Sequence, residues 1–177
     1  MKKGIELSIN FLVTVIIAIV IFGLGVKFIY NIVSESEDFE GLTLKHFDEM
    51  IGDLSCESTD KVCIPENRVA IQRGKFDVVG IKIINVLTDT TSKDFEITAD
   101  VSKILDKNDN IITDPVYSDN LDKIKIKYTK TVDIKKNEEA DVGVGIKVEK
   151  DAISGTHILD VKVEQYEELY KIYVKVP

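Results

Sequence analysis

The chain has 177 residues, of which 44% are hydrophobic, and its 31 acidic against 23 basic residues give a net charge of −8. The acid is unevenly spread, because residues 31–66 hold ten carboxylates against two lysines, whereas residues 67–177 together carry only −2. Such an acidic chain is repelled by the phosphates of nucleic acid, so we expect no nucleic-acid partner.

The first predicted element is an apolar helix within residues 1–33. Twenty residues, from Leu7 to Val26, carry no charge, and a helix of that length matches the ~30 Å hydrocarbon core of a bilayer. A secretory signal has a shorter apolar region of about 7–15 residues and then a small-residue cleavage site, which this sequence lacks. We therefore expect a transmembrane helix that is retained, with the lipid bilayer as its partner.

The charges at the two ends of this helix predict its orientation. Lys2 and Lys3 precede it, whereas the charged residues that follow Lys27 within residues 31–66 are mostly acidic. By the positive-inside tendency, the N-terminus lies in the cytoplasm and the remaining ~145 residues lie outside the cell. The sequence thus predicts a single-pass protein of the cell membrane with an extracellular C-terminal domain.

Residues 34–66 form an acidic collar with a helical pattern. Apolar residues recur there at helical spacing and predict one buried face: Phe39, Leu42, Phe47, Met50, Ile51 and Leu54. Ser34-x-x-Glu37 has the form of a capping box at the start of this pattern. The pattern fits either a separate amphipathic helix lying on the next domain or a bent continuation of the apolar helix.

The two cysteines of the chain, Cys56 and Cys63, stand at the end of the collar. Thiols outside a membrane tend to be oxidised, and a six-residue spacer can close into a disulfide loop. A zinc site needs four ligands, and the two histidines, His46 and His157, lie in unrelated segments. A catalytic cysteine paired with His46 is the other alternative, but a disulfide would leave it without a thiolate. We predict a disulfide.

From residue 67 to 177 the periodicity changes to two, which is typical of strands with one buried and one exposed face. Alternation is clearest in residues 124–128 and 170–176, and turn-forming residues separate the apolar segments. Seven or eight short strands without an intervening helix predict an antiparallel β-sandwich. Its expected core comprises Ile81, Ile83, Ile97, Ile126, Tyr128, Val144, Ile146, Val161, Val163 and Val174.

Motifs for catalysis or metal binding are missing from the sequence. Residues 106–110 match the first half of a calcium loop, but Ile111 and Tyr117 stand where that loop requires a glycine and a glutamate. A hairpin turn is the simpler interpretation. Ser154 lies near His157 with no orienting group implied, and His157 is predicted to be a surface residue of a strand. We expect no enzymatic activity, no cofactor and no metal site.

The segment from Lys135 to Val176 resembles the last strands of immunoglobulin- and fibronectin III-like surface domains. A polar turn precedes one strand, and the loop of residues 151–155, which contains an alanine and a glycine, leads to the next. The stretch RGKFDVVGIKIIN is similar to the opening strands of the same class. The resemblance covers about 110 residues, and it implies an immunoglobulin-like sandwich rather than an activity.

The N-terminus resembles the class III signal of archaeal type IV pilin-like proteins. Lys2, Lys3 and Gly4 lie directly before the apolar helix, and in that family a prepilin peptidase cuts after the basic and glycine residues and leaves the helix in place. The resemblance implies cleavage between Gly4 and Ile5. Bacterial pilins carry a glutamate at the fifth mature position, whereas Glu6 would be second here. Archaeal relatives lack that requirement.

Small residues within the apolar helix predict that other helices pack against it. Ser8, Ala18, Gly23 and Gly25 allow the backbone of a neighbouring helix to come close. The alternative is a plain membrane anchor, because membrane-spanning helices often contain glycine.

Together these features predict a structural cell-surface protein, a pilin-like subunit or minor pilin of an archaeal type IV pilus-like filament. Its expected partners are further copies or other pilin-like subunits, bound through the N-terminal helix. The alternative is a permanently membrane-anchored binding or adaptor module, which resembles the stator proteins of the archaellum or an envelope protein. The two hypotheses differ in the fate of residues 1–4 and in whether lipid or neighbouring helices cover the apolar helix.

Overall fold

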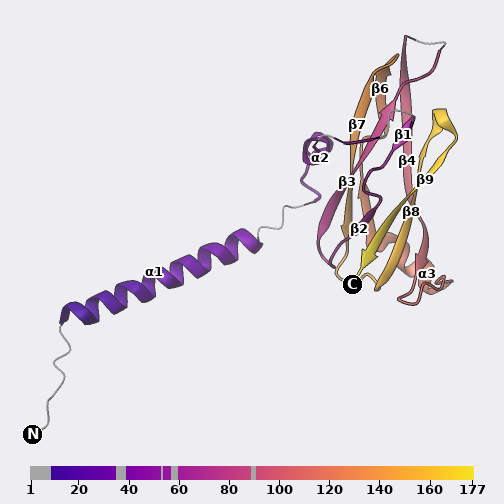
Figure 1. Ribbon diagram of the computed structural model, residues 1–177. Coiled ribbons are helices and arrows are strands. Elements are labelled where there is room, and N and C mark those ends of the chain that lie inside the picture. Colours follow the sequence, from indigo (N-terminus) through magenta and orange to yellow (C-terminus); the bar gives the residue numbers. More distant parts are fainter. Residues whose placement is uncertain (1–8, 35–38, 53, 57–59, 89–90) are drawn as a thin grey trace, which may run out of the picture. The chain divides into compact units, whose positions relative to one another are not determined.

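The computed structural model describes residues 9–34, 39–52, 54–56, 60–88 and 91–177 (Figure 1). The chain divides into two compact units, Met1–Asp38 and Phe39–Pro177. The collar from Phe39 onward therefore belongs to the same unit as the strands. The protein is mainly β, as the sequence predicted.

The first unit contains one long helix, α1 (Ile9–Ser34), which forms where the uncharged run predicted a helix. Over the part of the chain that the structure describes, no helix is long and apolar enough to cross a membrane. The membrane-spanning role of residues 1–33 stays a prediction.

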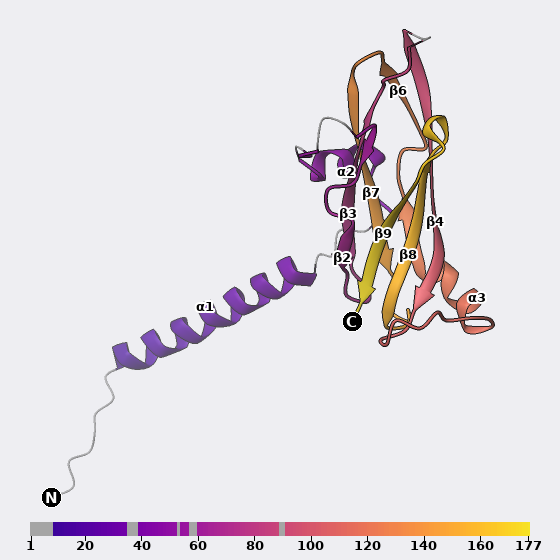
Figure 2. The same cartoon turned by 45° about the vertical axis from the view of Figure 1, so that its right-hand side comes forward.

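The second unit consists of two β-sheets that share one hydrophobic core (Figure 2). The first sheet has the order β1-β3-β7-β5, with bounds Val62–Cys63, Phe76–Ile84, Glu139–Val148 and Ile124–Lys127. The second sheet has the order β2-β9-β8-β4-β6, with bounds Arg68–Ala70, Leu169–Val176, Gly155–Val163, Ser92–Leu105 and Thr131–Lys135.

The core lies between the sheets because each long strand turns alternate side chains inward. In the first sheet Ile81 and Val144 point inward, and in the second sheet Val161 and Val174 do, all four with at most 2% of their surface exposed. Eight of the ten predicted core residues are buried. The other two, Ile126 and Tyr128, are partly buried and pack against the core. The predicted core is thus confirmed.

Two details of the predicted sandwich are wrong. Strand β2 pairs with β9 in parallel, Arg68 lying beside Tyr173, so the second sheet is mixed rather than antiparallel. Most of the sandwich separates these two strands in the sequence, so no hairpin dictates their relative direction. Short helical elements also interrupt the strands: α3 (Val116–Asn120), η1 (Leu121–Lys123) and η2 (Glu164–Tyr166). They are too short to show a helical period in the sequence.

The collar contains a separate helix, α2 (Leu44–Met50). Its N-cap is Thr43, whose hydroxyl oxygen accepts a hydrogen bond from the backbone N–H of His46 at 3.3 Å. The predicted capping box at Ser34 is therefore not the start of this helix, and Glu37 lies outside the described residues. Phe39 and Phe47 of the predicted apolar face are buried, whereas Met50 is 45% exposed.

His157 is fully buried, which corrects its prediction as a surface residue. It lies on β8 in the same alternating set as Leu159 and Val161, and that set faces the core. Its Nε2 atom is 3.2 Å from the Ile153 carbonyl oxygen, and within the described residues Nδ1 has no hydrogen-bond partner. Burial lowers the pKa of His157, and the Ile153 carbonyl opposes that shift only in part.

We predict that the folded protein loses stability as the pH falls below about 6.5. The unfolded chain binds a proton at His157 near that pH, whereas the folded chain resists protonation until a lower pH, so acid favours unfolding. Between pH 7.5 and 5.5 this single group removes up to about 1.4 kcal/mol. Urea unfolding of wild type and His157→Leu at both pH values checks it.

The His157→Leu variant is expected to lose that part of the pH dependence, while His46→Gln, which changes the other histidine, is expected to keep it. An identical change in urea midpoint for wild type and His157→Leu would show that His157 does not cause it.

Candidate functional site: the exposed apolar helix and the docked collar

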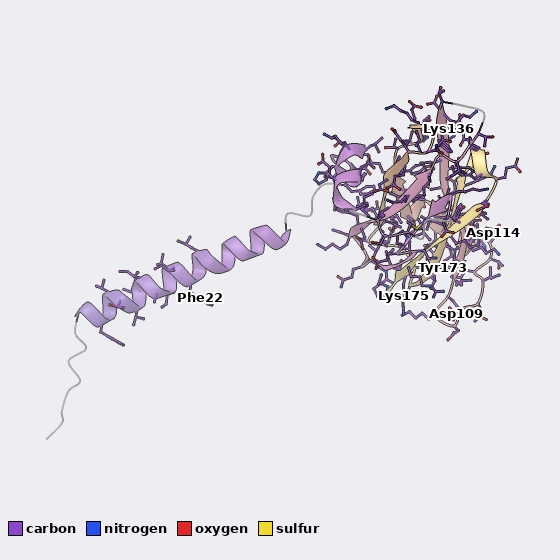
Figure 3. All side chains as sticks on the ribbon, turned by 45° about the horizontal axis from the view of Figure 1, so that its top comes forward. Phe22, Asp109, Asp114, Lys136, Tyr173 and Lys175 are labelled. Carbon is purple, nitrogen blue, oxygen red and sulfur yellow. A yellow bond between two sulfur atoms is a disulfide. The ribbon has the colours of Figure 1, made fainter. Side chains whose placement is uncertain are left out.

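The described part of α1 has an apolar surface on all sides. Eleven large apolar side chains between Phe11 and Leu24 are exposed, from 39% for Val15 to 73% for Phe22, which Figure 3 labels. Successive residues of a helix are rotated by about 100°, so these positions cover its whole circumference. Apolar surface of this extent is unfavourable in water, at roughly 25 cal/mol for each Å².

The small residues predicted to pack against other helices are only partly described. Ala18 is exposed, and a Cβ atom added to Gly23 would meet nothing within 4 Å. Among the residues that the structure describes, none therefore packs against Gly23. Gly25 belongs to α1, but its surroundings, like Ser8, lie outside the described residues. The predicted processing residues Lys2, Lys3, Gly4 and Ile5 also lie outside them.

The collar packs against the outer face of the first sheet in a notch formed by three glycines. Gly80 on β3 and Gly143 on β7 are paired neighbours, and Gly145 follows on β7. A Cβ atom at Gly143 would lie 2.4 Å from the Phe47 carbonyl oxygen, and one at Gly145 would lie 2.8 Å from the Phe47 ring. Glycine is required here because another backbone approaches the strand closely. Phe47 is fully buried in this notch.

Aromatic contacts extend this docking toward the start of the collar. The Phe39 ring lies 5.6 Å from the ring of Phe47 and 5.6 Å from that of Phe76 on β3, measured between centroids. Both distances and the tilted ring planes are favourable for aromatic pairs. Phe39 is itself 3% exposed, so the collar is held to the sheet from Phe39 onward.

Three hydrogen bonds also attach the collar to the first sheet. Strand β5 pairs with β7 only as far as Gly145. The backbone N–H of Gly143 points to the same side of β7 and donates to Asp48 Oδ1 at 2.8 Å. On β5, Lys127 Nζ donates to the carbonyl oxygens of Glu40 at 3.0 Å and Leu42 at 2.6 Å. Asp48 thus satisfies a strand N–H that would otherwise lack a partner.

The predicted disulfide between Cys56 and Cys63 is confirmed. Cys63 belongs to β1, which pairs with β3 at Lys82 and Ile83. The bond therefore closes the collar back onto the edge of the sheet on which α2 lies. Since both cysteines are oxidised, neither can act as the catalytic partner of His46.

The hairpin interpretation of residues 106–110 is confirmed. The Asp106 carboxylate accepts hydrogen bonds from the backbone N–H groups of Asn108 at 2.7 Å and Asn110 at 2.9 Å. These bonds, that from Asn110 first, lower the pKa of Asp106. The carboxylate is thus used within its own turn. Within the described ranges, no group of three or more His, Cys, Asp and Glu side chains could hold a metal ion.

The glycine notch is the feature that sequence reasoning missed. Gly143 and Gly145 occupy outward-facing positions of β7, where a strand ordinarily carries side chains. Glycine inside a strand often marks a close approach of another backbone, so this spacing was a usable signal.

Comparison with known proteins adds little. No protein-family model and no curated protein sequence matches the chain. Among solved structures it is similar to a family 123 glycoside hydrolase from Clostridium perfringens, with 15% identity and a TM-score of 0.40 over 76% of this chain and 25% of the hydrolase. It is also similar to a FixG-related protein from Vibrio parahaemolyticus, with 10% identity and a TM-score of 0.35 over 56% of this chain and 75% of that one. Likenesses at this level carry no argument about function.

We predict that Gly143→Ala destabilises the protein by about 1–3 kcal/mol, the usual cost of overpacking. The added methyl group meets the backbone of Phe47, which cannot rotate away. Gly80→Ala is the matched control, because the atoms nearest to its methyl group belong to the flexible side chain of Leu54 rather than to a backbone, and its cost is expected to stay below about 1 kcal/mol. Urea unfolding and hydrogen exchange of the α2 amides measure both effects. Equal losses in the two variants would contradict the close approach of the Phe47 backbone to Gly143.

We predict that the mature protein contains no free thiol and that its disulfide contributes about 2–3 kcal/mol through the short loop it closes. Alkylation of non-reduced, denatured protein should label no cysteine. The double variant Cys56→Ser, Cys63→Ser should unfold at lower urea yet retain its strand content, because the core between the sheets does not include the bond. Two labelled thiols would refute the prediction.

Proposed function

We propose that the protein is a structural component of the archaeal cell surface, a pilin-like subunit or minor pilin of a type IV pilus-like filament. In this proposal α1 is the retained helix of the family, with its N-terminus toward the cytoplasm. The two-sheet unit is an immunoglobulin-like domain outside the cell. Neighbouring helices of the filament, and lipid before assembly, cover the apolar surface of α1.

The observation that carries the proposal is the exposure of α1. Its described side chains from Phe11 to Leu24 are apolar on all sides except at Thr14, and all are exposed. A helix of this kind is stable only when lipid or other protein covers it. The uncharged run from Leu7 to Val26 supports the same proposal from the sequence.

The docked collar supports a role in which force passes from α1 to the second unit. A subunit held through α1 needs the chain that follows to be firmly attached to the domain it presents. Phe47 in the glycine notch, the Asp48 bond to Gly143 and the Cys56–Cys63 disulfide provide that attachment. Tension applied at Phe39 would act on these contacts before it reached the core.

A second candidate is a permanently anchored binding or adaptor module. The specific observation that favours it is a groove on the outer face of the second sheet, lined by Arg68 and Lys175. In this alternative residues 1–4 are kept and lipid alone covers α1.

We predict that the mature protein begins at Ile5 and that Lys3→Glu or Gly4→Asp blocks this processing. Gly25→Leu is expected to permit processing but to block assembly, because its larger side chain keeps neighbouring helices apart. N-terminal sequencing of the protein from its native membrane tests the first expectation, and sedimentation with electron microscopy of surface filaments tests the second.

Val20→Leu is the matched control for Gly25→Leu, since it enlarges a residue that is already bulky and should leave assembly unchanged. A mature protein that begins at residue 1, together with unchanged assembly in all variants, would favour the adaptor module over the filament subunit.

A further inference from the structure

The outer face of the second sheet contains a groove of about 360 Å³ at the end of the sandwich that holds the C-terminus. The strand register places Arg68 beside Tyr173, and it forms one row of Ala70, Lys175, Thr156 and Leu105 across four strands. Asp109, from the turn after β4, completes the lining. Figure 3 labels Tyr173, Lys175 and Asp109 close to one another at this end. The volume suits a small ligand or a short stretch of a polymer.

Arg68 is held in position and yet keeps its hydrogen-bonding capacity. Its guanidinium carbon lies 4.9 Å from the centroid of the Tyr173 ring, a cation–π contact that restrains the side chain. Within the described part of the chain, its guanidinium makes no hydrogen bond and no ion pair. Arg73 differs, since it donates to the Ala152 carbonyl and the Ser154 hydroxyl. The planar guanidinium of Arg68, with its paired N–H donors, is therefore available to bind a carboxylate.

Lys175 adds a second positive charge without a partner among the described carboxylates. On the same face of the sheet Lys171 is paired with Asp160 at 2.6 Å and Lys162 with Glu164 at 2.6 Å. The groove thus carries two free cations against the single carboxylate of Asp109, in a chain whose net charge is −8. An anionic group is attracted to this groove although the protein as a whole repels it.

The carboxylate of Asp109 limits which anionic ligands the groove can bind. Its carboxylate accepts no hydrogen bond from the described residues, and it would repel a ligand that offered only negative charge. It instead favours a ligand with hydroxyl donors beside its anionic group. Leu105 and Ala70 provide an apolar surface for the ring carbons of such a ligand.

We propose that this groove binds an acidic saccharide, a sugar polymer with carboxylate groups. The carboxylate binds between Arg68 and Lys175, sugar hydroxyls donate to Asp109, and the ring lies over Leu105 and Ala70. This site goes beyond the proposed function and does not depend on it, because the groove lies within the second unit and involves no residue of α1.

The test is calorimetric titration of the full-length protein in an uncharged detergent. A short oligogalacturonate is the probe, and a neutral galactose oligomer of the same length and an oligoglutamate peptide are the comparisons. The oligogalacturonate is expected to bind most tightly. Arg68→Lys keeps the positive charge but loses the paired N–H donors of the guanidinium, whereas Lys175→Gln loses the charge. Each variant is expected to weaken oligogalacturonate binding about tenfold, the effect of losing one charge-assisted hydrogen bond.

Lys125→Gln on β5 of the first sheet is the matched control, since it removes an exposed lysine from the other sheet and should leave binding unchanged. Asp109→Asn separates the ligand classes: it should weaken oligogalacturonate, which loses a charged acceptor, and strengthen oligoglutamate, which loses a repulsion. Equal binding of the three probes, tighter binding of oligoglutamate, or an equal loss in Lys125→Gln would each overturn the proposal.

Discussion

The close approach of Phe47 to the outer face of the first sheet is the contact on which the arrangement of the collar depends. Its carbonyl and ring occupy the space that side chains at positions 143 and 145 would fill. A strand residue without a Cβ atom loses β propensity and packing, so the two glycines weaken β7 when considered alone. Burial of the Phe47 ring offsets that loss, since a phenylalanine gains about 1.5–3 kcal/mol when fully buried. The sheet with these two glycines is therefore stabilised by the collar that packs on it.

The two outer faces of the sandwich differ in what covers them. The collar covers part of the outer face of the first sheet and ties it to the chain that leads from α1. The described residues of the collar do not cover the outer face of the second sheet, whose strands present alternating polar residues and the groove at Arg68. The collar contacts and the groove thus lie on opposite outer faces of the sandwich, so a ligand bound in the proposed groove would not displace the collar.

The sequence predicted those parts of the fold that follow from local periodicity. The strands with strict alternation, such as β9, and the buried residues along them could be read directly, because side chains of a strand point alternately to its two faces. The same rule would have placed His157 in the core beside Leu159, had its polarity not been given more weight. The disulfide was equally accessible, since it depends on two cysteines close in sequence.

The remaining features depend on residues far apart in the chain. The notch requires Gly80 to pair with Gly143, and Asp48 to reach an N–H that β5 leaves free, and no local pattern encodes such register. The groove likewise arises because β2 pairs in parallel with β9, which places Arg68 over Tyr173. A lysine or arginine on a strand is ordinarily a solvated surface residue. Only the pairing of distant strands brings Arg68 and Lys175 into one groove, so the sequence alone did not indicate this groove.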